Sequence, residues 1–255
     1  MRRSCYIISW LFLFFVLGNL VEGQLPAPRL DSIFPMGGKA GGSVDITLKG
    51  ADLTGEGQLF FNDPGITSEP IGKGVFKVKI AELVSSGSYD LRFGGKDGTT
   101  SPISFAVSNR DEKIAPKEAT NKAKAVFLED NVVMNGIMEP GKAHYYKFPV
   151  RNGGRYFIDC FAERINSRAD VLLVLTDSSG IEVARSRESI GGDPLIGFTS
   201  TSEGEYFLRV SDFLARGGAG YNYRIQLRQG PQIDFVLPLS AQPGKTQSFQ
   251  IFGKN

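Results

Sequence analysis

Cysteine and histidine are nearly absent from this chain of 255 residues. It holds two cysteines, Cys5 and Cys160, and one histidine, His144. Two cysteines allow at most one disulfide, so a disulfide-stapled fold is excluded, and a single histidine excludes metal centres built from several imidazoles. Stability must therefore come from apolar burial, and a hydrophobic content of 41% is sufficient for more than one core.

Net charge and basic clusters are lacking as well. The 29 basic and 27 acidic residues leave a formal charge of only +2, and no run of Lys or Arg stands out. Without a cluster of basic residues, the chain has no surface that would attract nucleic acid or an anionic membrane. We therefore expect neither of them as a partner.

Helix-like periodicity is missing too. Apolar and polar residues alternate over short stretches that end in clusters of Gly, Asn, Asp or Ser, the pattern of half-buried strands joined by tight turns. In the longest such stretch, 144–180, the alternating residues are Tyr146, Phe148 and Val150 before a glycine turn, and Tyr156, Ile158 and Cys160 after it. The sequence thus predicts an all-β protein.

The first 23 residues differ from the rest of the chain. Arg2 and Arg3 precede an apolar segment, 6–20, and the small residue Gly23 follows it. This arrangement is typical of a secretory signal peptide, and the apolar segment is shorter than the roughly 20 residues of a membrane-spanning helix. We expect residues 1–23 to be removed on export to the periplasm, the cell surface or the medium; an uncleaved anchor is the alternative.

Removal of the signal peptide leaves Cys160 without an intramolecular partner. On its strand it shares the parity of Tyr156 and Ile158, so we expect a buried side chain rather than a catalytic thiol. His144 follows a turn at a strand edge, and we expect it to face solvent rather than to act as a base. No clear catalytic constellation remains, and we expect no enzyme activity within these residues.

Residues 25–108 form the first expected domain. Short strands predicted at 44–48, 58–61, 75–80, 88–93 and 101–107, with no helix between them, favour an antiparallel sandwich of immunoglobulin type. The motifs of this segment are Pro28-Arg29-Leu30-Asp31-Ser32-Ile33-Phe34-Pro35, Gly41, Gly50, Asp52-Leu53 and Gly87-Ser88-Tyr89-Asp90-Leu91-Arg92-Phe93. They resemble the IPT/TIG family of Ig-like domains, which implies the same fold.

A polar segment with one proline, 109–124, is predicted as a linker, and residues 118–228 form the second expected domain. Its motifs are Gly136-x-x-Glu139-Pro140-Gly141, Tyr145-Tyr146-x-Phe148, Gly154-x-Tyr156-x-Ile158, Asp170-x-x-Leu173-x-Leu175 and Gly204-Glu205-Tyr206. They are similar to the bacterial pre-peptidase C-terminal (PPC) domain, which implies a jelly-roll-like β-sandwich of the kind appended to secreted enzymes and surface proteins. Where that family has Asp before the aromatic pair, this sequence has His144.

The end of the chain repeats its beginning. Residues 231–238, PQIDFVLP, align without a gap on 28–35, PRLDSIFP, and Gly253 falls on Gly50. We therefore expect 231–255 to be the truncated start of a second Ig-like domain. One or two strands cannot bury a core, so we expect a fragment of a longer protein, with this segment poorly packed or packed against the second domain.

Carboxylates in turns of the second domain are candidate metal ligands. Asp170, Asp177 and Asp193 could contribute to a Ca²⁺ site, because hard cations need several oxygen ligands. Their spacing matches no recognised calcium loop, and aspartates in turns more often bond their own backbone. No other cofactor is expected.

The loop 163–170 carries the candidate binding residues Glu163, Arg164 and Arg168. Its charges can pair internally and fix the loop, which we favour, or present guanidinium groups to an acidic sugar or another partner. A set of tyrosines is open to two interpretations, a sugar-stacking platform or ordinary sheet packing, and packing is favoured; the set is Tyr145, Tyr146, Tyr221 and Tyr223.

Taken together, the sequence predicts an exported, non-catalytic modular protein that serves in adhesion or binding, or as a spacer. The expected partners are a cell-surface or extracellular protein or polysaccharide and downstream domains of the same chain. This assignment is an analogy at the level of the fold. Two alternatives stay open: the accessory part of a secreted peptidase or other hydrolase whose catalytic domain lies beyond residue 255, and a carbohydrate-binding module.

Overall fold

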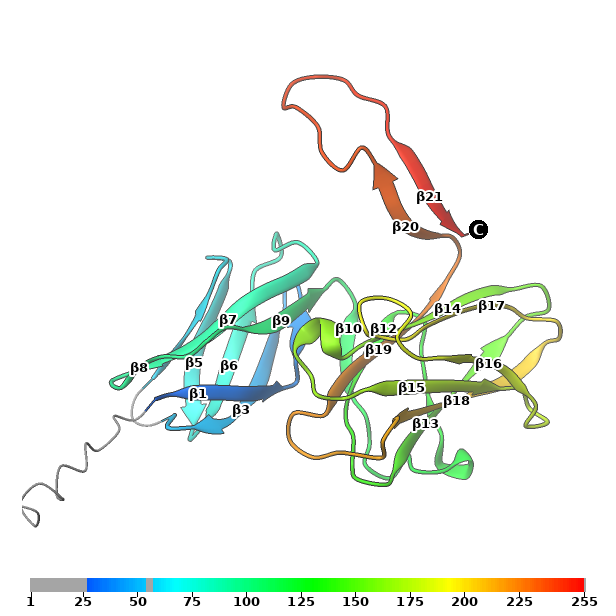
Figure 1. Ribbon diagram of the computed structural model, residues 1–255, viewed down its shortest axis with the longest axis horizontal. Coiled ribbons are helices and arrows are strands. Elements are labelled where there is room, and N and C mark those ends of the chain that lie inside the picture. Colours follow the sequence, from blue (N-terminus) through cyan, green and yellow to red (C-terminus); the bar gives the residue numbers. More distant parts are fainter. Residues whose placement is uncertain (1–26, 54–56, 255) are drawn as a thin grey trace, which may run out of the picture.

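The computed structural model describes residues 27–53 and 57–254. Their regular secondary structure consists of β-strands and two single-turn 3₁₀ helices, Lys122–Lys124 and Glu163–Ile165. The strands form two β-sandwiches and one separate hairpin (Figure 1), so the predicted all-β fold is confirmed. No helix in this part of the chain is long and apolar enough to cross a membrane. The predicted signal peptide, residues 1–23, lies outside the described residues.

The first sandwich packs two sheets of the segment 29–108 against each other. One sheet has the order β1 (Arg29–Phe34), β3 (Ser43–Ala51), β6 (Val75–Ile80) and β5 (Ile66–Gly72). The other has the order β2 (Gly37–Lys39), β9 (Ile103–Ser108), β7 (Gly87–Gly95) and β4 (Gln58–Phe61), with β8 (Gly98–Thr99) beside β7. Ile33, Ile46, Leu91 and Phe105 are fully buried between the sheets, as their alternation predicts.

The second sandwich comprises residues 111–229. Its first sheet has the order β10 (Asp111–Ile114), β12 (Val132–Ile137), β19 (Asn222–Gln229), β14 (Arg155–Phe161) and β17 (Leu195–Thr199). Its second sheet has the order β11 (Val126–Phe127), β13 (Ala143–Val150), β18 (Gly204–Asp212), β15 (Val171–Thr176) and β16 (Glu182–Ser186). Tyr146, Phe148, Ile158 and Cys160 lie in the core between them.

Two segments that the sequence does not predict as strands are paired. Residues 37–39, which are not among the predicted strands, form β2, which pairs in parallel with β9. The predicted linker 109–124 is likewise wrong in part, because 111–114 form β10, which pairs in parallel with β12. Neither segment shows an alternation of apolar and polar residues, so periodicity could not identify it as a strand. Each segment becomes a strand through its pairing with a neighbour.

The hairpin of β20 (Gln232–Leu237) and β21 (Gln250–Lys254) projects away from both sandwiches (Figure 1). Its register repeats that of β1 and β3: Ile233 pairs with Gly253 as Leu30 pairs with Gly50, with the irregularity at the next residue in both. The hairpin is poorly packed, as expected, because Ile233 is 59% exposed where Leu30 is 6% exposed.

Candidate functional site: the seam between the sandwiches

The first sheet of the second sandwich is covered on both faces. On β19, Tyr223, Ile225 and Leu227 point into the core, so Arg224 and Gln226 point to the opposite face. That outer face meets the end of the first sandwich, and Arg224 is consequently only 4% exposed. We call this contact the interdomain seam; its polar residues are Ser108, Glu112, Asn135 and Arg224, and its backbone acceptor is Ala106.

Arg224 connects the two sandwiches directly. Its Nη1 donates to the carbonyl oxygen of Ala106 at 2.8 Å, and its Nη2 forms an ion pair with Glu112. Burial lowers the pKa of Arg224, and the Glu112 carboxylate acts in the opposite direction. The ion pair therefore keeps the charge of a guanidinium that has lost almost all contact with water.

Glu112 is satisfied from three sides. Besides Arg224, its carboxylate accepts hydrogen bonds from Ser108 Oγ at 2.9 Å and from Asn135 Nδ2 at 2.7 Å. These donors come from the last strand of the first sandwich and from β12 of the second. Each carboxylate oxygen therefore has a donor, which offsets part of the cost of burying the pair.

Glycine at position 37 allows the sandwiches to approach this closely. A Cβ atom on Gly37 would lie 1.9 Å from the Ala106 oxygen and 2.3 Å from Arg224 Nη1. Any larger residue would displace the guanidinium from its acceptor.

A second set of contacts lies beside Arg224. Asn222 Nδ2 donates to the carbonyl oxygen of Ile33 at 3.0 Å, and Asn166 Oδ1 accepts from the Ser104 amide at 2.8 Å. Ile165 is 2% exposed and belongs to the apolar core of the first sandwich, although it comes from the second. The loop 163–170, singled out from the sequence as a binding candidate, is thus part of the seam.

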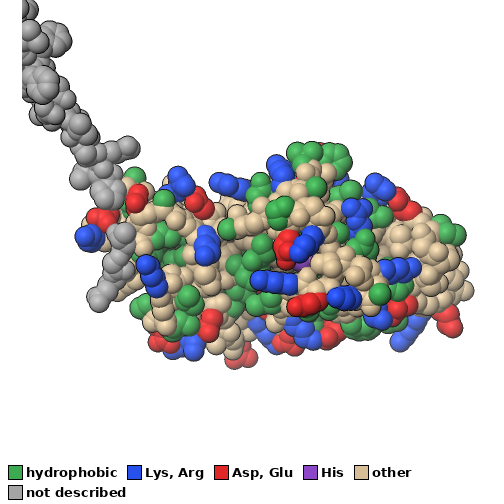
Figure 2. Space-filling view, turned by 90° about the horizontal axis from the view of Figure 1, so that it is seen from below, with side chains coloured by type: hydrophobic (Ala, Val, Ile, Leu, Met, Phe, Trp, Pro, Cys, Tyr) green, Lys and Arg blue, Asp and Glu red, His purple; other side chains and the backbone are tan. Residues whose placement is uncertain are grey.

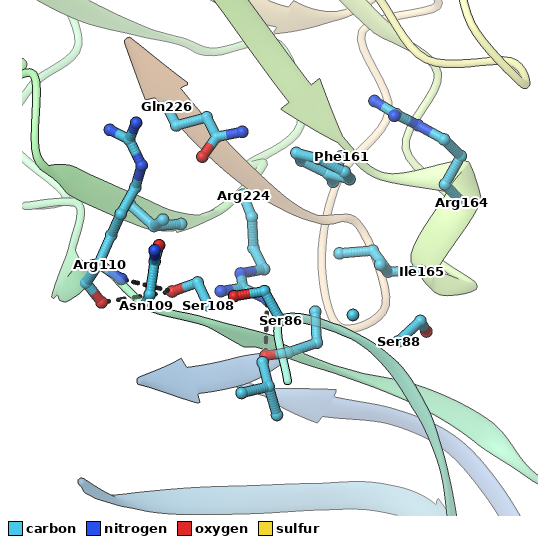
Figure 3. Close-up of a pocket in the computed structure, with 14 residues that line it drawn as sticks. Ser86, Ser88, Ser108, Asn109, Arg110, Phe161, Arg164, Ile165, Arg224 and Gln226 are labelled. Carbon is cyan, nitrogen blue, oxygen red and sulfur yellow. Dashed lines mark hydrogen bonds between the residues drawn. The ribbon is translucent and has the colours of Figure 1, made fainter. Parts of the chain in front are cut away.

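A cavity of about 380 Å³ opens along the seam (Figure 3). The first sandwich contributes Ser88 to its lining, the connection between the sandwiches contributes Arg110, and the second sandwich contributes Phe161, Ile165, Arg224 and Gln226. Arg110 and Gln226 lie on one side of the view and Phe161 and Ile165 on the other. Elsewhere the surface carries interspersed charges of both signs, as the face in Figure 2 shows.

Arg164, one of the predicted binding residues, has internal partners. Its Nε donates to Asp193 and its Nη2 to Asp159, each at 2.8 Å, and its guanidinium lies 4.1 Å from the centre of the Phe161 ring. Both carboxylates lie outside the loop 163–170, so Arg164 fixes the loop to neighbouring segments rather than through pairs within it. Glu163 and Arg168 are exposed at the surface.

The three predicted calcium ligands lie in three separate environments. Asp193 is fully buried and accepts from the amides of 162, 163 and 164 as well as from Arg164. Asp170 forms two hydrogen bonds with Arg187, at 2.8 and 2.6 Å, and Asp177 accepts from the Ser179 hydroxyl and the amide of 181. Within the described part of the chain, no group of three His, Cys, Asp or Glu side chains could hold a metal ion.

His144 does not face solvent, and that prediction is wrong. It is 5% exposed, and its Nδ1 lies 2.6 Å from the hydroxyl of Tyr223, which lies 2.6 Å from the hydroxyl of Tyr146. Burial lowers the pKa of His144, which favours the neutral ring. The missed signal is strand parity. His144, Tyr146 and Phe148 are every second residue of one strand, so their side chains point to the same face, which is the buried one.

The remaining sequence candidates are core residues. Cys160 is fully buried, as predicted, and burial together with the nearby Asp193 and Asp159 carboxylates raises the pKa of its thiol. A thiol that is protonated and inaccessible is a poor nucleophile. Tyr146 and Tyr223 are buried and cannot stack on a sugar, whereas Tyr145 and Tyr221 are half-buried.

Sequence reasoning missed Arg224 and Glu112, the residues at the centre of the seam. An isolated charged residue on a strand gives no local sign that a second domain will cover it. The available signal was indirect: Val133 and Phe157 are apolar residues on the outward parity of β12 and β14, and both are buried. Apolar residues of both parities indicate a strand covered on two faces.

Comparisons with known proteins give structural matches of low similarity. No protein-family model and no curated protein matches the chain. The pre-peptidase C-terminal domain of a collagenase from Bacillus anthracis matches with 16% identity and a TM-score of 0.33, covering 47% of this chain and 96% of that one. The same family was suggested by the motifs of residues 118–228.

Two further matches are binding or inhibitor proteins. The Aeromonas hydrophila PliG, a periplasmic inhibitor of g-type lysozyme, matches with 11% identity over 47% of this chain and 99% of that one, with a TM-score of 0.34. A Bacteroides ovatus SGBP-B, solved with a mixed-linkage heptasaccharide, matches with 12% identity over 73% of this chain and 74% of that one, with a TM-score of 0.26. At these TM-scores the architecture rests on the strand pairing described above, and the IPT/TIG resemblance of residues 25–108 stays a prediction.

Proposed function

We propose that this chain is an exported, non-catalytic modular protein that acts outside the cytoplasm as a rigid binding and spacing unit. The observation that carries the proposal is the buried pairing of Arg224 with Ala106 and Glu112. A surface linker leaves two domains free to reorient, whereas a buried ion pair that also bonds to the backbone of the other domain fixes their relative orientation.

Two features support a non-catalytic role. The single histidine, His144, is buried, neutral and bonded to Tyr223, so it has no accessible nucleophile to activate. Cys160 is buried, and the pKa of its thiol is raised. The support for export is the sequence of residues 1–23. On this proposal the partners are extracellular or cell-surface proteins or polysaccharides and further domains of the same chain.

The experiment is expression of the full chain with its own N-terminus in a bacterial host. We expect the exported product to begin at Gln24 by mass spectrometry, and the purified protein to leave a panel of peptide, ester and glycoside substrates unchanged. An unprocessed product retained in the cytoplasm would contradict export. Turnover that is lost in His144→Gln or Cys160→Ala would contradict the non-catalytic assignment.

A further inference from the structure

We propose that the cavity at the interdomain seam binds a small organic anion, a carboxylate carried on an apolar or aromatic body. The inference rests on the proposed function in one respect, since only a rigid seam keeps the cavity in place. The experiment below therefore tests the ligand and the rigid seam by separate measurements.

The size and position of the cavity suit a small ligand. About 380 Å³ lies within the range of ligand-binding pockets, and a boundary between domains is a common place for them. Walls from both sandwiches line it, and Ser88 at its edge is exposed to solvent. A ligand can therefore enter without separation of the sandwiches.

The charge of the lining favours an anion. Arg110, Arg164 and Arg224 line the cavity, and no Asp or Glu is among the described residues that do so. Arg164 and Arg224 are paired with carboxylates behind the cavity wall. Arg110 instead donates to the carbonyl oxygens of Asp130 and Leu227, and within residues 27–53 and 57–254 no ion pair joins it to a carboxylate. Its positive charge is the one left for a ligand to neutralise.

Arg224 lines the same cavity. Its side chain is 4% exposed and its charge is paired with Glu112, so it adds to the positive side of the lining without being the group that a ligand must neutralise. A carboxylate oxygen is an acceptor that complements the remaining charge, that of Arg110.

The apolar walls determine the rest of the ligand. Val133 and Ile165 are buried and Phe161 is half-buried. Phe161 and Ile165 lie on the side of the cavity opposite Arg110 (Figure 3). A purely polar anion would leave these side chains against water, whereas an alkyl or aromatic body would cover them. The geometry thus favours an amphipathic carboxylate over a sugar acid.

A matched set of probes tests this assignment on the full chain. 4-Phenylbutyrate, 4-phenylbutanol and 4-phenylbutylamine have one apolar body and differ in charge, and D-glucuronate has the carboxylate without the apolar body. By isothermal titration calorimetry and saturation-transfer NMR, we expect 4-phenylbutyrate to bind at least tenfold more tightly than each of the other three. Equal affinities, tighter binding of glucuronate, or no binding of 4-phenylbutyrate would overturn the proposal.

Variants locate the binding. Arg110→Gln should weaken 4-phenylbutyrate at least tenfold and leave 4-phenylbutanol unchanged, whereas the matched variant Arg151→Gln, at an exposed arginine outside the cavity, should change neither. Ser88→Trp, which adds a large side chain at an exposed edge of the cavity, should abolish binding of both. Unchanged binding in Arg110→Gln and Ser88→Trp would place the site elsewhere and overturn the proposal.

The same samples distinguish the ligand from the scaffold. Spin labels at the exposed positions Lys49 and Thr201, introduced as Lys49→Cys and Thr201→Cys, report the distance between the sandwiches. A narrow distance distribution without binding of 4-phenylbutyrate would refute the ligand class and leave the rigid unit standing. A broad distribution would refute the rigid unit itself.

Discussion

Arg224 Nη1 donates a 2.8 Å hydrogen bond to the carbonyl oxygen of Ala106, and the two residues belong to different sandwiches. Ala106 lies on β9, where its amide donates to the carbonyl oxygen of Met36. The guanidinium thus bonds to the backbone of the first sandwich rather than to a flexible surface side chain. The orientation of the two sandwiches is therefore set by the same kind of contact that sets the pairing of strands.

Loss of the guanidinium should destabilise the protein strongly. Arg224→Leu leaves the Glu112 carboxylate, which is bonded within the seam, without its cation, and removal of one member of a buried pair costs about 3 kcal/mol or more. We expect the free energy of unfolding in urea to fall by that amount. The double variant Arg224→Leu/Glu112→Leu should recover most of the loss; additive losses would contradict the pairing.

The stability should depend on pH through His144. Burial, the first cause, and the nearby Lys142 lower the pKa of His144, and Glu139 acts in the opposite direction. Because the folded state resists protonation that the unfolded chain accepts near pH 6.5, stability is greatest above that pH and falls as the pH decreases below it. One proton gives a slope of at most about 1.4 kcal/mol per pH unit.

The measurement is the free energy of unfolding between pH 7.5 and 5.5, where most carboxylates stay ionised. His144→Gln keeps a hydrogen-bonding group for Tyr223 but does not titrate, so it should flatten the profile in this window. A profile of equal slope in the variant and in the native sequence would show that His144 is not the group responsible.

Gly136 should not tolerate a side chain. A Cβ atom at this position would lie 2.2 Å from Cζ of Tyr223, whose ring is buried and whose hydroxyl is bonded to His144 and Tyr146. Gly136→Ala should therefore cost about 2 kcal/mol through overpacking. Gly141 has a positive φ, so alanine there would be strained and is unsuitable as the control. A Cβ atom on Gly87 would meet nothing within 4 Å, so Gly87→Ala should be nearly neutral. Thermal melting distinguishes the two.

Asp193 should act through structure rather than through calcium. It is fully buried, with three backbone amides and Arg164 as donors, so Asp193→Asn should lower the free energy of unfolding by about 3 kcal/mol. Because Asp170 and Asp177 are engaged elsewhere, millimolar Ca²⁺ should leave the melting temperature of the native sequence unchanged. A calcium-dependent rise that is lost in Asp177→Asn would contradict this assignment.

Much of the fold could be predicted because its strands are local patterns. The ranges 58–61 and 75–80 are strands with the predicted bounds, and the alternation around Tyr146 and Ile158 identifies core residues correctly. In each case the burial of a side chain follows from its parity within the strand. The repeat of residues 28–35 at 231–238 likewise reappears as a repeated strand register.

The seam could not be predicted because its contacts join residues far apart in the chain. Glu112 lies in a polar stretch that predicts a linker, and it becomes part of β10 because it meets Asn135 and Arg224. His144 was misassigned for a different reason, since its position after a turn was given more weight than its parity. Charged residues are buried only where a partner neutralises them, and a single sequence does not show which partner that is.

The most direct measurement of the central claim is the distance between the two sandwiches by double electron–electron resonance, with labels at Lys49→Cys and Thr201→Cys. Cys160 is fully buried and should not take up label. The account predicts one narrow distance distribution that agrees with the structure and that broadens in Arg224→Leu. A broad distribution in the native background, unchanged by Arg224→Leu, would contradict it.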